Sequence, residues 1–142
     1  MRRATITGWG KYLPPNVMNN KDLEKIVDTT DEWIRKRTGI KERRIADEST
    51  STSDLALKAT YEALNKANLD PKKLDLIIVS TVTPDMAFPA TACIIQDTIG
   101  AENAAAFDLE AGCSGFGYGL SVGAQFIESG LYDDVVVSGA ET

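Results

Sequence analysis

The stretch that decides the fold of this chain is Phe107-Asp108-Leu109-Glu110-Ala111-Gly112-Cys113-Ser114-Gly115-Phe116. Its apolar start predicts a short buried strand, and the small residues that follow predict a sharp turn into a helix with Cys113 at or near its first residue. The first backbone N–H groups of a helix have no partner within it, and their field stabilises a thiolate. The same groups can stabilise an oxyanion on a carbonyl that the sulfur attacks. The stretch therefore predicts a nucleophilic cysteine at a strand-to-helix junction.

Strand and helix patterns alternate along the rest of the chain. β-branched and apolar runs predict strands over residues 4–12, 75–81, 104–109 and 133–139. Apolar spacing, capping residues and stop signals predict helices over 22–27, 54–67, 89–99 and 113–129, and a further helix with Thr29 as N-cap that ends at Gly39. The runs at 75–81 and 133–139 are typical of parallel strands covered on both faces. We therefore predict an α/β layered domain with a mainly parallel sheet and no internal domain boundary.

The predicted helix over residues 113–129 has an unusual composition. Gly115, Gly119 and Gly123 recur every four residues and form a flat stripe, which lets another backbone approach closely. Glycine costs about 1 kcal/mol relative to alanine within a helix, so the stripe needs a structural reason. Apolar side chains spread over much of the remaining surface: Phe116, Tyr118, Leu120, Val122 and Phe126. We expect something outside this chain to cover the far side, and we interpret the chain as one half of a larger layered protein.

Composition excludes several classes of function. The chain has 142 residues, a net charge of −6, two cysteines and no histidine, so a metal site and general nucleic-acid binding are both disfavoured. No apolar run has the length of a membrane span, and nothing indicates disulfides, so we expect a cytoplasmic protein. Cys93 lies in an apolar helical run and is interpreted as a core thiol. A cluster of basic residues within 35–44 is either a solvated turn or a patch for an anionic ligand or partner.

Motifs spread along the whole chain resemble those of one enzyme family. They are Gly8-Trp9-Gly10-Lys11-Tyr12-Leu13-Pro14, Asp31-Glu32-Trp33-Ile34-Arg35-Lys36-Arg37-Thr38-Gly39-Ile40, Glu42-Arg43, Ala87-Phe88-Pro89-Ala90-Thr91-Ala92-Cys93 and Ala111-Gly112-Cys113-Ser114-Gly115-Phe116. Together they resemble the N-terminal half of a thiolase-superfamily condensing enzyme, and more narrowly bacterial β-ketoacyl-acyl carrier protein synthase III. The resemblance implies a thiolase-like layered fold with a mainly parallel mixed sheet. Residues 1–142 would form the first of two pseudo-repeated halves, with the C-terminal half absent from this chain.

The resemblance also implies roles for individual residues. Cys113 would take an acyl group from coenzyme A as a thioester, Trp33 would stack on the adenine, and Arg37 would lie near the phosphates. Thr29 would make a nearby polar contact. Phe88 would reach across a homodimer to line the partner's acyl pocket. Acyl-coenzyme A is then a substrate, no cofactor is tightly bound, and acyl carrier protein is a partner. The histidine and asparagine of the decarboxylative step would lie in the C-terminal half.

Each of these residues also has a plain structural interpretation. Cys113 could be an inert buried thiol, Trp33 a half-buried helix anchor, Phe88 a packing residue and Thr29 only a cap. Two rival functions stay open. One is a condensing enzyme of the same fold with a different primer or product. The other is a catalytically incomplete domain that binds coenzyme A or a partner, to which the lack of histidine points.

Overall fold

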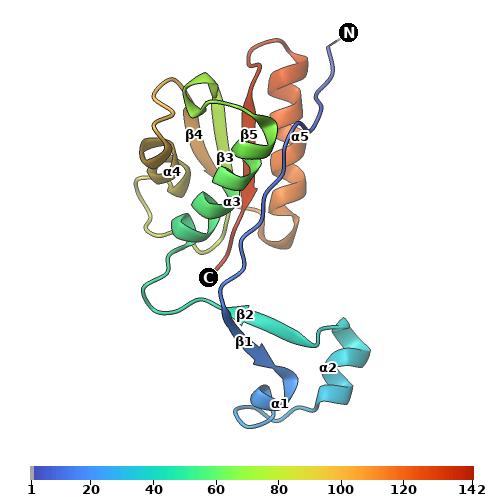
Figure 1. Ribbon diagram of the computed structural model, residues 1–142. Helices are drawn as coiled ribbons and strands as arrows, with labels where there is room; N and C mark the ends of the chain where they lie inside the picture. Colours follow the sequence, from blue (N-terminus) through green and yellow to red (C-terminus); the bar gives the residue numbers. More distant parts are fainter. Residues whose placement is uncertain (1) are drawn as a thin grey trace. The chain divides into compact units, whose positions relative to one another are not determined.

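The computed structural model describes residues 2–142, which form two compact units. The layered unit holds the chain up to Tyr12 together with Ser51–Thr142, and the small unit holds Leu13–Thr50. The small unit contains β1 (Asn16–Asn19), α1 (Asn20–Leu23), α2 (Asp31–Thr38) and β2 (Glu42–Ile45). The layered unit contains α3 (Thr52–Ala67), η1 (Pro71–Lys73), β3 (Leu76–Ser80), α4 (Thr91–Ile99), β4 (Ala105–Leu109), η2 (Gly112–Ser114), α5 (Gly115–Glu128) and β5 (Val135–Gly139) (Figure 1). The sequence analysis predicted no such internal division.

A parallel sheet in the order β4-β3-β5 forms the centre of the layered unit. Every residue of β3 is buried, as its continuous apolar run predicts. Ile77 and Val79 join the core that α3 and α4 supply, whereas Ile78 faces the glycines of α5. Helices therefore lie on both faces of the sheet, α3 and α4 on one and α5 on the other (Figure 1). The predicted α/β layered architecture with a mainly parallel sheet is confirmed.

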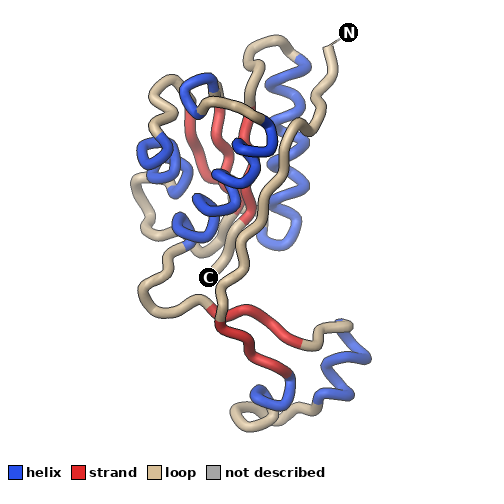
Figure 2. The backbone as a smooth tube through the Cα atoms, in the orientation of Figure 1, coloured by secondary structure: helices blue, strands red, loops and turns tan. Residues whose placement is uncertain are grey.

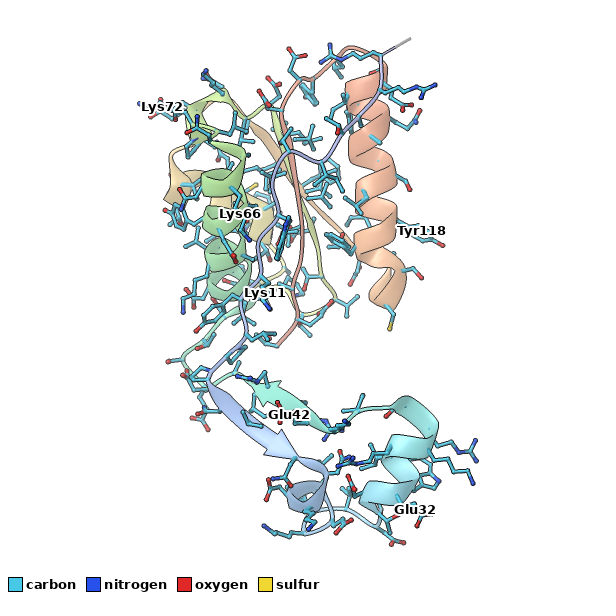
Figure 3. The ribbon with its side chains drawn as sticks, turned by 45° about the vertical axis from the view of Figure 1, so that its right-hand side comes forward. Lys11, Glu32, Glu42, Lys66, Lys72 and Tyr118 are labelled. Carbon is cyan, nitrogen blue, oxygen red and sulfur yellow. The ribbon has the colours of Figure 1, made fainter. Side chains whose placement is uncertain are left out.

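The glycine stripe of α5 packs against this chain's own sheet. Gly115, Gly119 and Gly123 are buried, and a Cβ on Gly119 would lie 2.8 Å from Val137 Cγ1 and 3.0 Å from Ser80 Oγ. The stripe is filled from within this chain, because side chains of β3 and β5 occupy the space that the glycines leave, so it is no argument for or against a missing half. The far side of the helix is exposed, as expected: Phe116, Tyr118 and Leu120 are 49%, 58% and 39% accessible. Tyr118 points away from the sheet in Figure 3.

Residues 4–12 were predicted as a strand, and this prediction was wrong. Within residues 2–142 they pair with no strand, and Figure 2 shows them as loop. The segment lies on α3 instead, where Gly8 and Gly10 approach the helix so closely that a Cβ on either would strike its backbone. The Lys11 N–H donates to Glu62, and the Lys66 ammonium lies 3.4 Å from the centre of the Trp9 ring. Residues 8–11 therefore lie against α3 and form no sheet edge.

The small unit contains a two-stranded antiparallel sheet that the sequence analysis missed. β1 pairs with β2 from Asn16 opposite Ile45 to Asn19 opposite Glu42. The predicted helix over 22–27 is shorter and starts earlier, because Asn19 caps α1. The predicted capping of α2 was also off by one residue. Thr30 is the N-cap, and its hydroxyl accepts from the Trp33 N–H at 3.1 Å, so Thr29 is not the cap.

We predict that Gly119→Ala destabilises the layered unit by about 1–3 kcal/mol, because the new methyl group overpacks the contact with Val137 and Ser80. Gly117→Ala is the matched control on the same helix, since nothing lies within 4 Å of a Cβ there. The control should stabilise by up to about 1 kcal/mol through helix propensity. Urea unfolding of both variants checks the prediction. Equal effects at the two positions would show that the stripe does not set the spacing between helix and sheet.

Candidate active site

Cys113 lies at the junction between strand β4 and helix α5. β4 ends at Leu109, Glu110 and Ala111 follow, and Gly112–Ser114 form a single 3-10 turn before α5 begins at Gly115. Gly112 has φ +52°, a left-handed conformation that side chains disfavour, so a glycine suits this turn. The helix was predicted to start at Cys113; the cysteine instead occupies the middle of the 3-10 turn. The predicted junction of strand, turn and helix is otherwise as observed.

Cys113 is exposed within this chain, so it is not the buried thiol of the alternative interpretation. The turn places it just ahead of α5, whose axis carries partial positive charge at that end. A thiol in this position can attack an electrophilic carbonyl, and nearby helix N–H groups can stabilise the oxyanion that forms. Cys93 differs from it: that thiol is partly buried, and its Sγ lies 3.7 Å from the Ala106 carbonyl oxygen. The two cysteines therefore differ in how readily a substrate can reach the thiol.

On α2, Trp33 and Arg37 form one surface. The Trp33 side chain is 57% exposed, and the Arg37 guanidinium carbon lies 6.0 Å from the centre of its ring. Ile34 is the residue that anchors this helix, since it is 6% exposed. Trp33 is thus more exposed than Ile34, and its indole is accessible on the surface of the small unit. An exposed flat indole beside a cation can hold an aromatic group that carries negative charge.

The opposite face of α2 is held by a polar network around Asn20. This side chain is 1% exposed, donates to Asp31 at 2.7 Å and to the Ile40 carbonyl at 2.8 Å, and accepts from Arg43. Asp31 in turn accepts from Arg35 at 2.8 Å. The hydrogen bond from Arg35, and then that from Asn20, hold the pKa of the Asp31 carboxyl below its usual range. Because the network uses the face of residues 31 and 35, the face of Trp33 and Arg37 is left open.

Phe88 is 88% exposed, so it does not pack within this chain. It lies in the connection between β3 and α4, where α4 begins at Thr91, two residues later than predicted from Pro89. The predicted site residues thus fall into two groups. Cys113 and Phe88 belong to the layered unit, whereas Thr29, Trp33 and Arg37 belong to the small unit. Residues 2–142 contain no cluster of His, Cys, Asp or Glu that could hold a metal ion.

Comparison with known proteins places this geometry in context. Residues 107–142 match the family described as 3-oxoacyl-[acyl-carrier-protein] synthase III. A β-ketoacyl-[acyl-carrier-protein] synthase III from Caldanaerobacter subterraneus is 63% identical over 98% of this chain and 42% of its own length. That of Natranaerobius thermophilus is 56% identical over 100% and 43%. The chain is homologous to the N-terminal part of β-ketoacyl-[acyl-carrier-protein] synthase III.

Solved structures agree with this assignment. The 3-oxoacyl-[acyl-carrier-protein] synthase III of Aquifex aeolicus superimposes with a TM-score of 0.91 at 54% identity, over 99% of this chain and 44% of that one. The priming β-ketosynthase of the R1128 polyketide pathway gives 0.90 at 38% identity, over 97% and 42%. This chain thus has the fold of the matched part of the synthase. The chain spans less than half the length of the relatives it matches.

Two residues that shape these sites escaped the sequence analysis. Asn20 is the buried centre of the small unit, and Asp108 on β4 accepts the first two N–H groups of α4 at 2.7 and 2.8 Å. A carboxylate within an otherwise apolar strand was the available signal for Asp108, because burying a charge requires hydrogen-bond donors. For Asn20 no comparable signal exists, since the same residue is common in turns and caps.

We predict that the Asp31 carboxyl titrates below its ordinary value of 3.8 in an NMR pH titration, because Arg35 and Asn20 donate to the charged form. A carboxylate with a lowered pKa in the folded state stabilises that state above its unfolded pKa. This contribution is lost as the pH falls through the lowered value. Asp31→Asn should therefore lower the thermal midpoint at neutral pH, and its difference from the native protein should shrink below about pH 4.

Asp28→Asn is the control for the comparison of thermal midpoints, because Asp28 is exposed and precedes α2. It should leave the thermal midpoint nearly unchanged at every pH. A titration midpoint of the Asp31 carboxyl at or above its ordinary pKa of 3.8 would contradict the hydrogen-bond network.

None of the helices within residues 2–142 combines the length and hydropathy that a membrane span requires.

Proposed function

We propose that the native protein condenses a short acyl-coenzyme A primer, acetyl-coenzyme A, with malonyl-acyl carrier protein and so starts fatty acid synthesis in the cytoplasm. The observation that carries the proposal is the exposed Cys113 thiol on a turn ahead of α5, in a chain homologous to β-ketoacyl-[acyl-carrier-protein] synthase III. Acyl carrier protein is the proposed partner, as the names of these relatives indicate.

In the first half-reaction, the Cys113 thiolate attacks the thioester carbonyl of the primer. The carbon–sulfur bond to coenzyme A breaks, coenzyme A leaves as a thiol after taking up a proton, and the acyl group stays on Cys113. Helix N–H groups at the turn stabilise the tetrahedral oxyanion between these states. In the second half-reaction, malonyl-acyl carrier protein loses carbon dioxide, and its carbanion attacks the acyl-cysteine. The β-ketoacyl product forms and the thiolate is regenerated.

The small unit would bind the coenzyme A portion. Trp33 offers a flat exposed face for the adenine, and Arg37 places a cation within 6.0 Å of the ring centre. Leu13–Thr50 carries eight basic and eight acidic residues, so the net charge of −6 arises outside this unit. A phosphorylated ligand is therefore repelled less by this neutral unit, with the basic end of α2, than by the acidic remainder of the chain. Thr29, half-buried just before the cap, would add a polar contact.

Phe88 is proposed to line the acyl pocket of a second copy in a homodimer. A phenyl ring that is 88% exposed has no packing role in its own chain, so cover by another protein surface is its simplest use. The histidine and asparagine of the decarboxylative step would come from sequence beyond this chain, which contains no histidine. The proposed active protein is thus longer than 142 residues, in keeping with the length of its relatives.

A second candidate is a condensing enzyme with another primer. The fold also superimposes on a polyketide priming β-ketosynthase at 38% identity, so the architecture is not limited to one product. A profile of initial rates across acyl-coenzyme A chain lengths separates the candidates. A binding domain without catalysis is the third possibility. It would bind coenzyme A without becoming acylated.

We predict that Cys113→Ala abolishes covalent acylation, measured as the gain of one acetyl group in the intact mass after incubation with acetyl-coenzyme A. Cys93→Ala is the matched control and should acylate as the native protein does, because its thiol is partly buried against the Ala106 carbonyl. An acetylated Cys113→Ala protein would refute the assignment of the nucleophile.

We predict that Arg37→Glu raises the KM for acetyl-coenzyme A about tenfold, since it replaces a charge-assisted contact by repulsion. The rate constant at saturation should change much less, because Arg37 is assigned to binding and not to the chemical step. Lys36→Glu carries the same charge change on the neighbouring exposed position of α2. An equal rise in KM for the two variants would indicate general electrostatics, and no rise for Arg37→Glu would contradict a role in binding.

A further inference from the structure

The exposed segment Met86–Ala90, which carries Phe88, is tied to the layered unit at both ends by carboxylates. At its start, Asp85 accepts the Ser53 N–H at 2.8 Å and the Ser53 hydroxyl at 2.5 Å, at the beginning of α3. At its end, Asp108 on β4 accepts the N–H groups of Thr91 and Ala92 at 2.7 and 2.8 Å. A short exposed segment is thereby held between two fixed points.

Asp108 takes the place of a missing helix cap. The N-cap position of α4 is Ala90, whose side chain has no oxygen to accept a hydrogen bond. The first N–H groups of a helix need an acceptor, and a carboxylate also suits the positive end of the helix. Asp108 supplies the acceptor and the negative charge from a different element. The start of α4 is therefore fixed to β4 and not to its own preceding residues. Phe88 lies only three residues before Thr91.

The same carboxylate lies on the strand that leads to the nucleophile. Asp108 is opposite Val79 in the register of β4 with β3, and Cys113 follows it by five residues. Strand β4 therefore connects, through one side chain and a short turn, the end of the Phe88 segment with the cysteine. We infer that Asp108 is a positioning residue, which fixes the Phe88 segment to β4 and so sets how Phe88 is presented to the acyl pocket of the second copy and which acyl chains that pocket accepts.

This inference deepens the proposed function and rests on it, since it assumes that Cys113 is acylated and that Phe88 bounds the acyl site of a second copy. The tether itself can be tested without the proposed function, because it consists of two hydrogen bonds to the Asp108 carboxylate. Phe88, which is 88% exposed, gains little from packing within this chain. Its placement therefore depends on the backbone anchors.

The two carboxylates differ in how they tolerate replacement by an amide. Both donors to Asp108 are backbone N–H groups, so in Asp108→Asn the amide NH₂ would face a donor and one hydrogen bond is lost. One donor to Asp85 is the Ser53 hydroxyl, which can turn and accept from an amide in Asp85→Asn. Asp108→Asn should therefore release the segment, whereas Asp85→Asn should release it much less.

The first measurement is amide hydrogen exchange in the native full-length protein. In Asp108→Asn, protection of at least one of the Thr91 and Ala92 amides should fall about tenfold or more, as expected for loss of a charge-assisted hydrogen bond. Asp97→Asn is the matched control, because Asp97 is exposed near the other end of α4 and should leave these amides unchanged. Unchanged protection in Asp108→Asn would overturn the tether.

The second measurement compares kcat/KM for a long-chain acyl-coenzyme A with that for acetyl-coenzyme A. The ratio should change about fivefold or more in Asp108→Asn, since small displacements of a positioned group have large effects on rate. It should change much less in Asp85→Asn and stay constant in Asp97→Asn. Lost protection with a constant ratio would overturn the positioning role and leave Asp108 as a helix cap only.

Thr91→Pro provides a second route if Asp108→Asn does not fold. Proline is favoured at the first position of a helix, and Ala90, at φ −59° and ψ 147°, already has the backbone that a residue before proline prefers. The substitution removes one donor to Asp108 and keeps the carboxylate. It should change the same ratio, and a constant ratio would count against the inference. Failure of the proposed function would show differently, as native protein that takes no acyl group.

Discussion

The structure depends on the complete burial of β3 between two parallel neighbours. Every residue of Leu76–Ser80 is buried, and its two edges pair with β4 and β5 in matched register. Ser80 lies opposite both Leu109 and Gly139, so the three strands end together at one edge. The Thr81 N–H donates to the Leu109 carbonyl, and the Ala140 N–H donates to the Ser80 carbonyl, which extends the ladder by one step on each side. The turn that carries Cys113 therefore starts from a fixed position.

Beyond that edge, side chains take over from the ladder. The Glu141 carboxylate, which follows β5, accepts from the Thr83 hydroxyl at 2.6 Å and from the Val82 N–H at 3.1 Å. The Thr52 hydroxyl, at the start of α3, donates to the Thr83 carbonyl at 2.5 Å. Residues 81–83 after β3 are thus held by a neighbouring strand end and by a helix start. The same arrangement recurs with Asp85 and Asp108, and in each case a carboxylate satisfies backbone donors that no ladder reaches.

Much of the layered unit could be predicted because its elements depend on local patterns. The apolar runs of β3 and β5, the amphipathic spacing of α3 and the glycine after α4 each carry their own signal. The errors arise where a distant partner decides the outcome. Residues 4–12 have the alternation of a strand, yet their neighbour is α3, which Gly8 and Gly10 approach closely. The stripe in α5 was correctly seen as a surface for close approach, but the periodicity of a helix does not say which sheet approaches it.

In the candidate site, too, some features follow from local patterns in the sequence and others depend on a distant partner. Trp33 and Arg37 are one helical turn apart, so their common face follows from spacing alone, and Cys113 follows from a strand, a turn and a helix in sequence. Asp108 acts on residues 16 and 17 positions earlier in the chain, through a contact that only the packing of α4 on β4 creates. The local geometry of Trp33, Arg37 and Cys113 could therefore be predicted from residue type and spacing. The contact of Asp108 with α4 could not be predicted in this way, because any of many polar residues could have supplied the same two hydrogen-bond acceptors from another element.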